Sequence, residues 1–390
     1  MRVKLRPDDF RVEERIRLPE SNGAYAYYRV EKCNRTTLAV RDAMAAQLRV
    51  TPSALVFPAL KDKSAITTQY ASVRKRGPAK LEGKGYTAER VGWGTRALRP
   101  GDLDGNRFQV VVRDLDEADA AALGPAMAKL GTYGLPNYFD DQRFGSRTRD
   151  GFIGKEILKR DAERVVHMYL AEPMAGDRRE IRQFKRLCAS HWGQWGYLLH
   201  QAPRPSNFRS VITYLKDHPH EYRKAANLIK DRLLSIYLSA YQSWVWNLIV
   251  SASFRRNGST PYDVTIMKEQ FALPEPGAAL EALHTVLVDL PRLTARYEGV
   301  FEAAAETVFD DEGLGLRDFK ARILRRVYLT KGERPVAFRP IEVSSQDAQP
   351  DEEIPDRWQV TLGFSLSTGQ YATLITKAAA ALISAEIRVR

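Results

Sequence analysis

The first part of the chain alternates hydrophobic and polar residues with a period of two, which is typical of half-buried β-strands. In the segment DFRVEERI, the side chains of Phe10, Val12 and Ile16 are separated by charged residues, and YAYYRVE continues the alternation. The same reasoning predicts strands for ALVFPAL, ITTQYASVRK and RFQVVVRDL, and for RWQVTLGFSL near the end of the chain.

Hydrophobic spacings of three and four residues predict helices between and after these strands. TLAVRDAMAAQLRV follows Thr36 and Thr37, which suit the N-cap position, and EADAAALGPAMAKL predicts a second helix. From about Gly154 the pattern is mainly helical, in GKEILKRDAERVVHMYL, DRREIRQFKRL, NFRSVITYLKDHP and EYRKAANLIKDR. A last helix is expected after Gly369, in YATLITKAAAALISAEI.

The order of these elements predicts an α+β protein with a mixed, largely antiparallel sheet, because no regular strand–helix–strand rhythm is present. Strand-forming segments at both ends of the sequence enclose a helical middle, which indicates a sheet domain that carries an insertion. A length of 390 residues agrees with two domains.

Residues 233–254 carry no charged side chain, so a membrane span has to be considered. Polar residues recur in this stretch at every fourth position, namely Ser235, Ser239, Ser243, Asn247 and Ser251. This spacing lays a polar stripe along one face of a helix. Hydrocarbon disfavours such a stripe, and we therefore expect a helix buried between two layers of protein.

The excess of positive charge favours a polyanionic partner, and nucleic acid is a better candidate than a membrane surface. The alternative is that the charges are simply solvated on the surface. Sixty Lys and Arg face 48 Asp and Glu, a net charge of +12. The two cysteines, Cys33 and Cys188, are far apart and form no CxxC pattern, and the histidines are scattered. We expect neither a disulfide framework nor a metal site, and a cytoplasmic location, since the start of the chain has no apolar core of a signal peptide.

One acidic residue is singled out by its setting. Residues 58–70 read PALKDKSAITTQY, with Asp62 between Lys61 and Lys63 at a turn between two expected strands. A solvated turn is one interpretation. The other is a carboxylate kept ionised by nearby cations and available for chemistry.

Five stretches occur together in one order along the chain. They are DDFRVEE (8–14), ALKDKSAITTQ (59–69), GLPNYFDDQRFG (134–145), LSAYQSWVWN (238–247) and FSLSTGQYAT (364–373). This set resembles the TruD family of tRNA pseudouridine synthases, in which the patterns run DFxVEE, GxKDxxAxTxQ, PNYFGxQRFG, SAxxSxxFN and a strand ending GSYAT. The resemblance runs nearly end to end, and the helical middle resembles the expanded form of archaeal and eukaryotic-type members.

The resemblance implies an enzyme that isomerises uridine to pseudouridine in tRNA, usually at position 13 of the D arm, without cofactor or metal. It implies a pseudouridine-synthase-like catalytic domain from residues 1–171 and 339–390, with an inserted, mainly helical TRUD-type domain at 172–338. The implied partner is tRNA, and no DNA, membrane or obligatory protein partner is expected.

By the same resemblance Asp62 matches the catalytic aspartate, which either attacks C1′ of the ribose or takes the 2′ proton. Lys4 resembles a lysine placed near that aspartate, the alternative being a frayed surface lysine. Lys61 and Lys63 are expected to meet phosphates instead, because neighbours in an extended segment point to opposite sides.

Four further residues match substrate-binding positions. Phe10 and Tyr371 correspond to aromatic positions of the uridine pocket, although the strand pattern alone places Phe10 in the core. Asn137 corresponds to an asparagine beside the target base or ribose, the alternative being a turn residue after a proline. Phe139 occupies a place where other pseudouridine synthase families use tyrosine. Arg143 suits either a phosphate or a structural carboxylate.

The chain departs from the family pattern at three positions. Ala59 replaces a usual glycine, Asp140 replaces the glycine of NYFG, and Ser367 replaces a proline. If the position of Asp140 requires a positive φ, an aspartate adopts it at some cost, and its carboxylate would face an anionic ligand.

Two other functions are alternatives for this sequence. A non-catalytic RNA-binding or RNA-chaperone protein on the same fold would not require Asp62. A glycosidase-like hydrolase would need a second acidic residue to pair with Asp62, and the sequence offers no convincing one.

Overall fold

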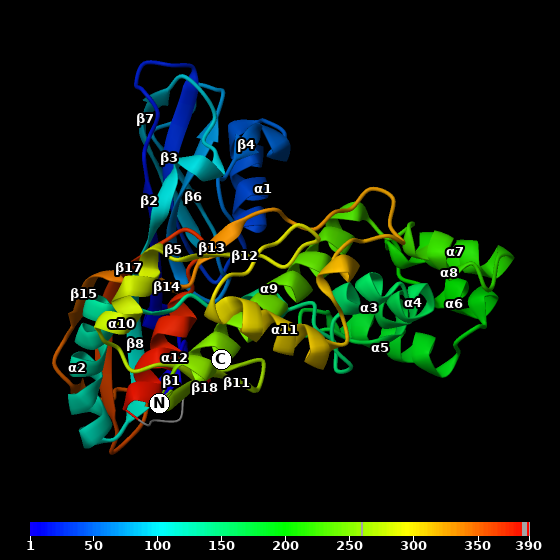
Figure 1. Ribbon diagram of the computed structural model, residues 1–390. Coiled ribbons are helices and arrows are strands. Elements are labelled where there is room, and N and C mark those ends of the chain that lie inside the picture. Colours follow the sequence, from blue (N-terminus) through cyan, green and yellow to red (C-terminus); the bar gives the residue numbers. More distant parts are fainter. Residues whose placement is uncertain (259, 384–387, 390) are drawn as a thin grey trace. The chain divides into compact units, whose positions relative to one another are not determined.

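The computed structural model describes residues 1–258, 260–383 and 388–389, which fold as two compact units (Figure 1). Unit 1 comprises Met1–Leu135, Pro276–Glu281 and Phe338–Arg390, and unit 2 comprises Pro136–Glu275 and Ala282–Ala337. Unit 2 thus begins earlier than the inserted domain expected at 172–338. That domain division stays a prediction, because compactness alone does not decide which residues serve catalysis.

Unit 1 is built on one sheet, to which twelve strands belong among the described residues. The main path runs β15-β17-β8-β2-β5-β3-β7-β6, and β2–β5 is its one parallel pair. The expected α+β class with a largely antiparallel sheet is therefore confirmed. The strands are β1 (Arg2–Val3), β2 (Phe10–Ile16), β3 (Tyr25–Cys33), β4 (Leu55–Val56), β5 (Ile66–Val73), β6 (Lys80–Gly83), β7 (Tyr86–Gly94), β8 (Leu103–Leu115), β15 (Ile341–Ser345), β16 (Gln349–Pro350), β17 (Trp358–Ser367) and β18 (Arg388–Val389).

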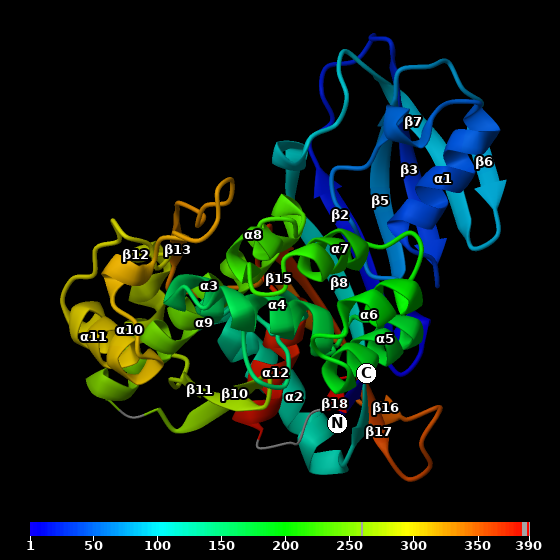
Figure 2. The same ribbon diagram turned by 90° about the vertical axis from the view of Figure 1, so that its right-hand side faces the viewer.

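Helices cover this sheet at two places. Helix α1 (Thr37–Leu48) lies beside β3 and β5 in both ribbon views (Figures 1 and 2) and buries Val40, Met44 and Leu48 against them. Helices α2 (Glu117–Tyr133) and α12 (Ala372–Leu382) pack on each other, and α2 also packs on β8, β15 and β17. A short helix, α10 (Ala278–Glu281), contacts α2. The last residues of the expected C-terminal helix, 384–387, lie outside the described residues.

The expected strand ALVFPAL is shorter than predicted. Only Leu55–Val56 pair, with β5, and the chain from Phe57 to Ala65 is irregular. Pro58 explains the early end, because proline has no N–H to donate to a ladder. The result is a longer loop around Asp62 than the alternation indicates.

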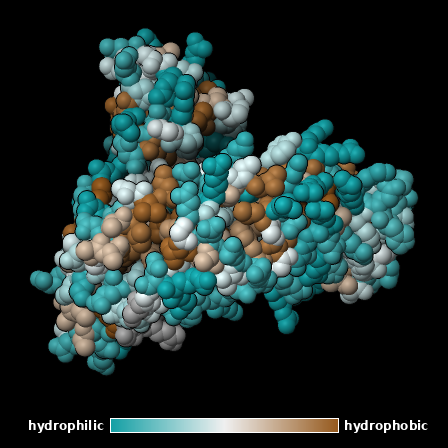
Figure 3. All heavy atoms as spheres, viewed as in Figure 1, coloured by the Kyte–Doolittle hydropathy of each residue, from teal (hydrophilic) through white to brown (hydrophobic). Residues whose placement is uncertain are grey.

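Unit 2 is mainly helical. Its helices are α3 (Ile153–Lys159), α4 (Ala162–Ala171), α5 (Arg179–Ser190), α6 (Trp195–Gln201), α7 (Phe208–Asp217), α8 (Tyr222–Ala226), α9 (Asp231–Asn257) and α11 (Val300–Glu312). Its strand pairs are β10 (Tyr262–Ile266) with β11 (Glu269–Leu273), and β12 (Leu287–Asp289) with β13 (Glu333–Pro335). The short strands β9 (Leu135–Pro136) and β14 (Ala337–Phe338) lie where the chain passes between the units. Hydrophilic residues predominate on the visible face over α6, α7 and α8 (Figure 3).

Two helices expected to be continuous are broken. The first divides into α3 and α4 at Arg160, whose φ of 66° ends α3, while the side chain of Asp161 accepts a hydrogen bond from Arg164 N and caps α4. The second divides into α8 and α9 around Asn227, whose side chain bonds to the backbone of Ile323 and Arg325. Both breaks depend on capping and long-range contacts that hydrophobic spacing does not report.

The uncharged stretch 233–254 forms most of α9, and its polar stripe is buried in the later turns. Ser243, Asn247 and Ser251 are 1%, 0% and 6% exposed. Across the described residues, the helices are too short or too polar to cross a membrane. The expectation of a helix buried within protein is therefore confirmed.

Candidate active site

Asp62 lies in the irregular loop between β4 and β5, close to the start of α1. The backbone N–H of Lys61 donates to Thr37 Oγ1 at 3.0 Å, and Thr37 Oγ1 donates to Gln69 Oε1 of β5 at 3.1 Å. Thr36, not Thr37, caps the helix, by accepting from Ala39 N. The hydroxyl of Thr37 is therefore available to tie the loop before Asp62 to α1 and to the sheet.

Lys4 pairs directly with Asp62. Its Nζ lies 3.0 Å from Asp62 Oδ2, with the lysine side chain 13% and the aspartate side chain 40% exposed. Lys4 follows β1 with a φ of 62°, a left-handed conformation that is uncommon for lysine. The pair thus combines a mostly buried cation with a carboxylate that a substrate can reach.

Phe10 lies beneath this pair and is mostly buried. Lys4 Nζ lies 3.9 Å from the centroid of the Phe10 ring, and the ring meets Phe108 edge-on at 5.9 Å. Phe108 stacks in turn on Phe364, at 5.5 Å. Phe10 is 3% exposed. The ring is the first of a layer that reaches from Lys4 into the core of the sheet.

Lys61 turns away from solvent, contrary to the interpretation that it meets phosphates. Its Nζ lies 3.1 Å from Glu14 Oε1, with side chains 10% and 0% exposed, and it also donates to Asn106 Oδ1. Glu14 Oε2 accepts from Tyr70 N at 2.8 Å. Burial raises the pKa of Glu14 above its usual range, and the charge and hydrogen bond of Lys61 oppose that rise. Lys61 therefore connects the Asp62 loop to strands β2 and β8 inside the protein.

A second buried lysine supports the loop, and sequence reasoning missed it. Lys32, at 1% exposure, donates from Nζ to the backbone carbonyl of Asp62 at 2.6 Å. Burial lowers the pKa of Lys32 to about 8, against the opposing effect of the Asp62 charge. The burial of Lys32 has a signal in the sequence, since it shares a strand face with Ala26, Tyr28 and Val30, where an apolar residue is expected.

Tyr371 precedes α12 as its N-cap residue, after a turn that closes β17. Ser367 N donates to Gln370 Oε1 at 3.0 Å, and Gly369 has a φ of 84°. Tyr371 itself is half-buried. The replacement of the family's proline by Ser367 supplies this N–H, which proline lacks.

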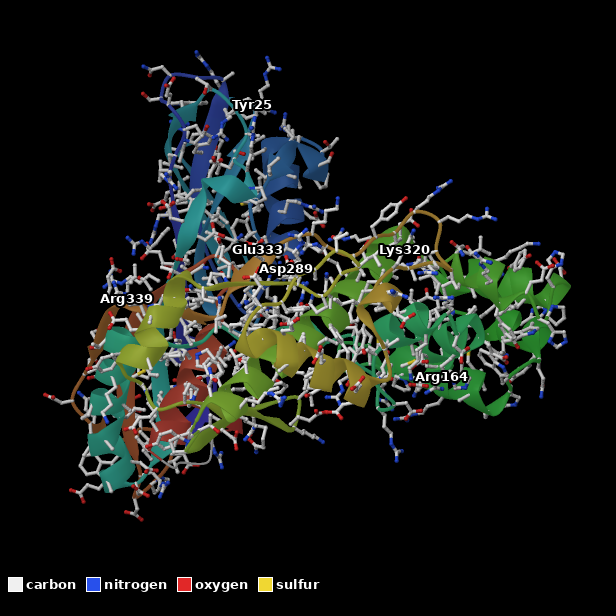
Figure 4. All side chains as sticks on the ribbon, viewed as in Figure 1. Tyr25, Arg164, Asp289, Lys320, Glu333 and Arg339 are labelled. Carbon is white, nitrogen blue, oxygen red and sulfur yellow. The ribbon has the colours of Figure 1, made fainter. Side chains whose placement is uncertain are left out.

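Asn137 is held by unit 2 itself. Its Oδ1 accepts from Arg334 Nη2 at 2.6 Å, and its Nδ2 donates to Pro335 O at 3.1 Å. Arg334 Nε also donates to the Asn137 carbonyl at 2.7 Å. Arg334 belongs to β13, whose Glu333 faces Asp289 across the pair with β12 (Figure 4). With 3% exposure, Asn137 links the loop after β9 to β13.

Phe139 is positioned by α9. Asn247 Oδ1 accepts from Phe139 N at 2.9 Å, and Asn247 Nδ2 donates to Phe139 O at 2.7 Å. The ring meets Trp246 edge-on at 5.7 Å, and the guanidinium carbon of Arg334 lies 4.1 Å from its centroid. Both the backbone and the ring of Phe139 are therefore fixed.

The other members of the polar stripe act in the same way. Ser243 Oγ accepts from Arg143 Nε at 3.0 Å, and Ser251 Oγ accepts from Ala272 N at 2.9 Å. Arg143 also lies over the Phe139 ring, at 5.6 Å. Successive turns of α9 thus hold the loop 137–143 and strand β11, which explains why this buried face is polar.

Asp140 has a φ of −106°, so the loop does not use the left-handed conformation considered for this position. The residue is 0% exposed, and its carbonyl accepts from Arg143 N at 2.7 Å. An aspartate therefore replaces the family's glycine without backbone strain.

The six candidate residues divide between the units. Lys4, Phe10, Asp62 and Tyr371 belong to unit 1, whereas Asn137 and Phe139 belong to unit 2. Contacts join Lys4, Phe10 and Asp62 to one another. Within the described part of the chain, no group of three or more His, Cys, Asp and Glu side chains is arranged to hold a metal ion.

Comparison with known proteins gives one consistent result. The family model described as "TruD: tRNA pseudouridine synthase D (TruD)" matches residues 1–378. The "Probable tRNA pseudouridine synthase D 2" of Methanocaldococcus jannaschii is 29% identical over 391 residues, covering 97% of this chain and 91% of the relative. The "tRNA pseudouridine synthase D" of Aquifex aeolicus is 26% identical over 391 residues, covering 97% of each chain.

A solved structure has the same fold. The crystal structure of the putative tRNA pseudouridine synthase D from Methanosarcina mazei superposes with a TM-score of 0.73 at 21% identity, and the match covers 97% of this chain and 92% of that one.

Proposed function

The chain belongs to the TruD family of tRNA pseudouridine synthases, and we propose that it isomerises uridine 13 in the D arm of tRNA with Asp62 as the catalytic carboxylate. The observation that carries this proposal is the pairing of an accessible Asp62 carboxylate with Lys4 at 3.0 Å. Asp62 lies in the stretch of this chain that matches the family's catalytic motif.

The reaction defines what the carboxylate has to do. The bond between C1′ and N1 of uridine breaks, the uracil turns, and a bond forms between C1′ and C5. C5 then loses its proton and N1 gains one, so the change is an isomerisation. An ionised Asp62 serves either as the nucleophile at C1′ or as the base that takes the 2′ proton, and a neutral side chain does neither.

The surroundings of Asp62 suit this task. Lys4 orients the carboxylate through Oδ2, while Lys32 and the Thr37 hydroxyl hold the backbone of the loop at Asp62 and Lys61. A flipped base also needs a face to replace the stacking that it loses. We assign that contact to Tyr371, which is half-buried, and assign Phe10 the role of supporting Lys4.

The two candidate residues of unit 2 serve substrate binding in this proposal. Asn137 and Phe139 are locked by Arg334 and Asn247. The Asn137 amide donates once, to Pro335 O, and accepts once, from Arg334, so its second N–H and its second lone pair suit a base edge or a ribose hydroxyl. The net charge of +12 suits contacts with tRNA phosphates, and we expect the enzyme to work in the cytoplasm.

The test replaces Asp62 with asparagine. Asp62→Asn is expected to abolish pseudouridine formation in single-turnover assays, while tRNA affinity stays within a few-fold of the wild-type value. The matched control is Asp104→Asn, because Asp104 is another exposed carboxylate of unit 1 paired with a cation, Arg17, at 2.6 Å. This control is expected to leave the rate unchanged.

A second variant tests the ion pair. Lys4→Met removes the cation but keeps an apolar stem over Phe10, and we expect the rate to fall by about tenfold to a hundredfold. Lys4→Arg is expected to recover part of that loss.

Normal pseudouridine formation by Asp62→Asn would refute the catalytic assignment. Tight tRNA binding by a wild-type protein that forms no pseudouridine would favour the RNA-binding alternative.

A further inference from the structure

A surface loop of unit 2, the basic segment, comprises residues 320–331. Both ribbon views show it projecting beyond the helices of that unit (Figures 1 and 2). Asn227 holds its backbone, donating to Ile323 O at 2.8 Å and accepting from Arg325 N at 3.0 Å, and Arg223 donates to Arg322 O. Four of its five aliphatic side chains are buried, namely Ala321, Ile323, Leu324 and Val327, and Leu329 is half-buried.

The outward side of the basic segment carries only cations and polar groups, apart from one aromatic ring. The sequence KARILRRVYLTK contains no acidic residue, and the side chains of Lys320, Arg322, Arg325, Arg326 and Lys331 are exposed. The described ion pairs join none of these five to a carboxylate. Figure 4 labels Lys320 near the start of the loop. The buried side chains of the basic segment thus pack against unit 2, and its exposed cations are available to bind an external partner.

Tyr328 has no structural explanation. It is 79% exposed, the largest exposed fraction of any large hydrophobic side chain in the described part of the chain. An aromatic ring in such a setting gains nothing from the core of its own protein. It suits a partner with a planar face, as an unpaired base has.

A groove of about 700 Å³ lies between the basic segment and helices α7 to α9. Four of its lining residues are cations, Arg223, Lys224, Arg325 and Arg326, and one is an aspartate, Asp231. Lys224 is already paired with Glu221 at 2.6 Å. The three arginines line a groove that is open to solvent, and guanidinium groups bind phosphate oxygens through paired hydrogen bonds.

We propose that the basic segment and its groove form a second RNA-binding surface on unit 2, where arginines hold phosphates and Tyr328 stacks on an unpaired base. The inference rests on the proposed function, since it takes the substrate tRNA to be the RNA concerned. A membrane surface is a poor fit, because four of the five aliphatic residues of the segment are buried and are not available to enter a lipid layer. An acidic protein would use the cations but not the exposed ring.

The first experiment measures the dependence of tRNA affinity on salt. The full-length variant Arg325→Gln/Arg326→Gln is expected to bind about tenfold more weakly at 100 mM salt, with a log–log slope shallower by about 1 to 2. The matched control, Arg325→Lys/Arg326→Lys, keeps both charges and is expected to keep the wild-type slope.

The second experiment separates stacking from charge. Tyr328→Ala is expected to weaken tRNA binding by about tenfold with no change in salt slope, whereas Tyr328→Phe keeps the ring and the affinity. Exposed side chains are replaced in every case, and circular dichroism checks that the variants fold.

Single-turnover assays at saturating tRNA distinguish this proposal from the proposed function. A wild-type rate in the variants, reached at higher tRNA concentration, supports a binding surface separate from the chemistry. Unchanged affinity and slope in the glutamine variant, with tRNA still modified, would overturn this inference and favour an acidic protein partner. If the wild-type protein fails to modify tRNA, the proposed function fails, while the affinity comparison still decides whether the segment binds RNA.

Discussion

The ammonium group of Lys32 donates a hydrogen bond to the backbone carbonyl of Asp62, at 2.6 Å. The bond joins a lysine at 1% exposure, at the end of β3, to the residue that carries the candidate catalytic carboxylate. A buried cation thus sets the position of an accessible anion. The pKa of Lys32, lowered by burial to about 8, makes this support sensitive to pH.

The sign of this effect on stability follows from linkage. Lys32 is lowered from its usual 10.5 to about 8 in the folded protein, so the unfolded chain binds the proton more tightly between these values. The contribution of Lys32 to the free energy of unfolding is therefore expected to increase as pH rises from about 8 to 10.5. Urea unfolding of wild type and Lys32→Met across this range measures it, and parallel curves would contradict the prediction.

The rate of pseudouridine formation is expected to fall as pH rises, whereas the contribution of Lys32 to stability increases. The charge of Lys32 faces Asp62, Lys61 and Cys33, and above about pH 8 it is lost. The rate of pseudouridine formation is then expected to fall, because a neutral amine holds the Asp62 carbonyl less strongly. Single-turnover rates from pH 6.5 to 9.5 test this, with Lys32→Met as the control expected to lack the decline.

Lys61 and Glu14 form a buried pair whose disruption is expected to destabilise unit 1. Lys61→Met leaves the Glu14 carboxylate, at 0% side-chain exposure, without its cation, at a cost of about 3–5 kcal/mol. The double variant Glu14→Gln/Lys61→Met is expected to lose less than the two single variants together. Urea unfolding of all four proteins measures the coupling. A stable Lys61→Met with a shallower salt slope for tRNA would instead restore the phosphate interpretation.

Asn247 is expected to matter more than any other polar residue on the buried face of α9. Asn247→Leu removes both hydrogen bonds between the Asn247 amide and the buried backbone of Phe139, at a cost of about 1–3 kcal/mol for each bond. Pseudouridine formation is expected to fall as well, since the loop 137–143 loses its anchor. Ser253→Ala is the control, because Ser253 donates within its own helix, to Val250 O, and we expect a loss below about 1 kcal/mol. Equal stability of the two variants would argue against the anchor.

Phe10 and Tyr371 are expected to respond differently to the loss of their rings. Phe10→Ala removes a side chain at 3% exposure and is expected to cost about 3–5 kcal/mol of stability. Tyr371→Ala removes a half-buried ring, and we expect a smaller loss of stability with modification about tenfold to a hundredfold slower. Tyr371→Phe should restore most of the rate. An unstable Tyr371→Ala that modifies tRNA normally when folded would mark Tyr371 as a core residue.

Alternation and helical spacing predicted strands β2, β3, β5, β8 and β17 of unit 1 and its helices α1, α2 and α12, whereas strands β6, β7 and β15 were not predicted. The strands at Phe10, Tyr25 and Ile66 begin within a residue of the expected positions, because each buries at least one face in the core. The breaks at Arg160 and Asn227 were not predictable in this way. They depend on a left-handed residue and on a side chain that binds a segment about a hundred residues further along the chain.

The candidate site shows the same limit. Lys61 and Lys63 look equivalent in the sequence, and only the arrangement of β2 and β8 shows that Lys61 has Glu14 and Asn106 as partners. A partial signal was present, because Glu14 shares a strand face with Phe10 and Val12, as Lys32 does with Val30. A charged residue at a strand position where the alternation expects an apolar residue predicts a buried ion pair or hydrogen bond, although the pattern does not identify the partner.

The pairing of β8 with β17 has a consequence for synthesis of the chain on the ribosome. These strands lie side by side in unit 1, yet all of unit 2 is translated between them. At about 5–20 residues per second, the roughly 240 intervening residues delay β17 by about 12–50 s. Until then β8 presents one open edge, which is a site for pairing with other chains. Nascent copies on one messenger are therefore most exposed to misassembly at this strand, and a chaperone that shields it would act before β17 emerges.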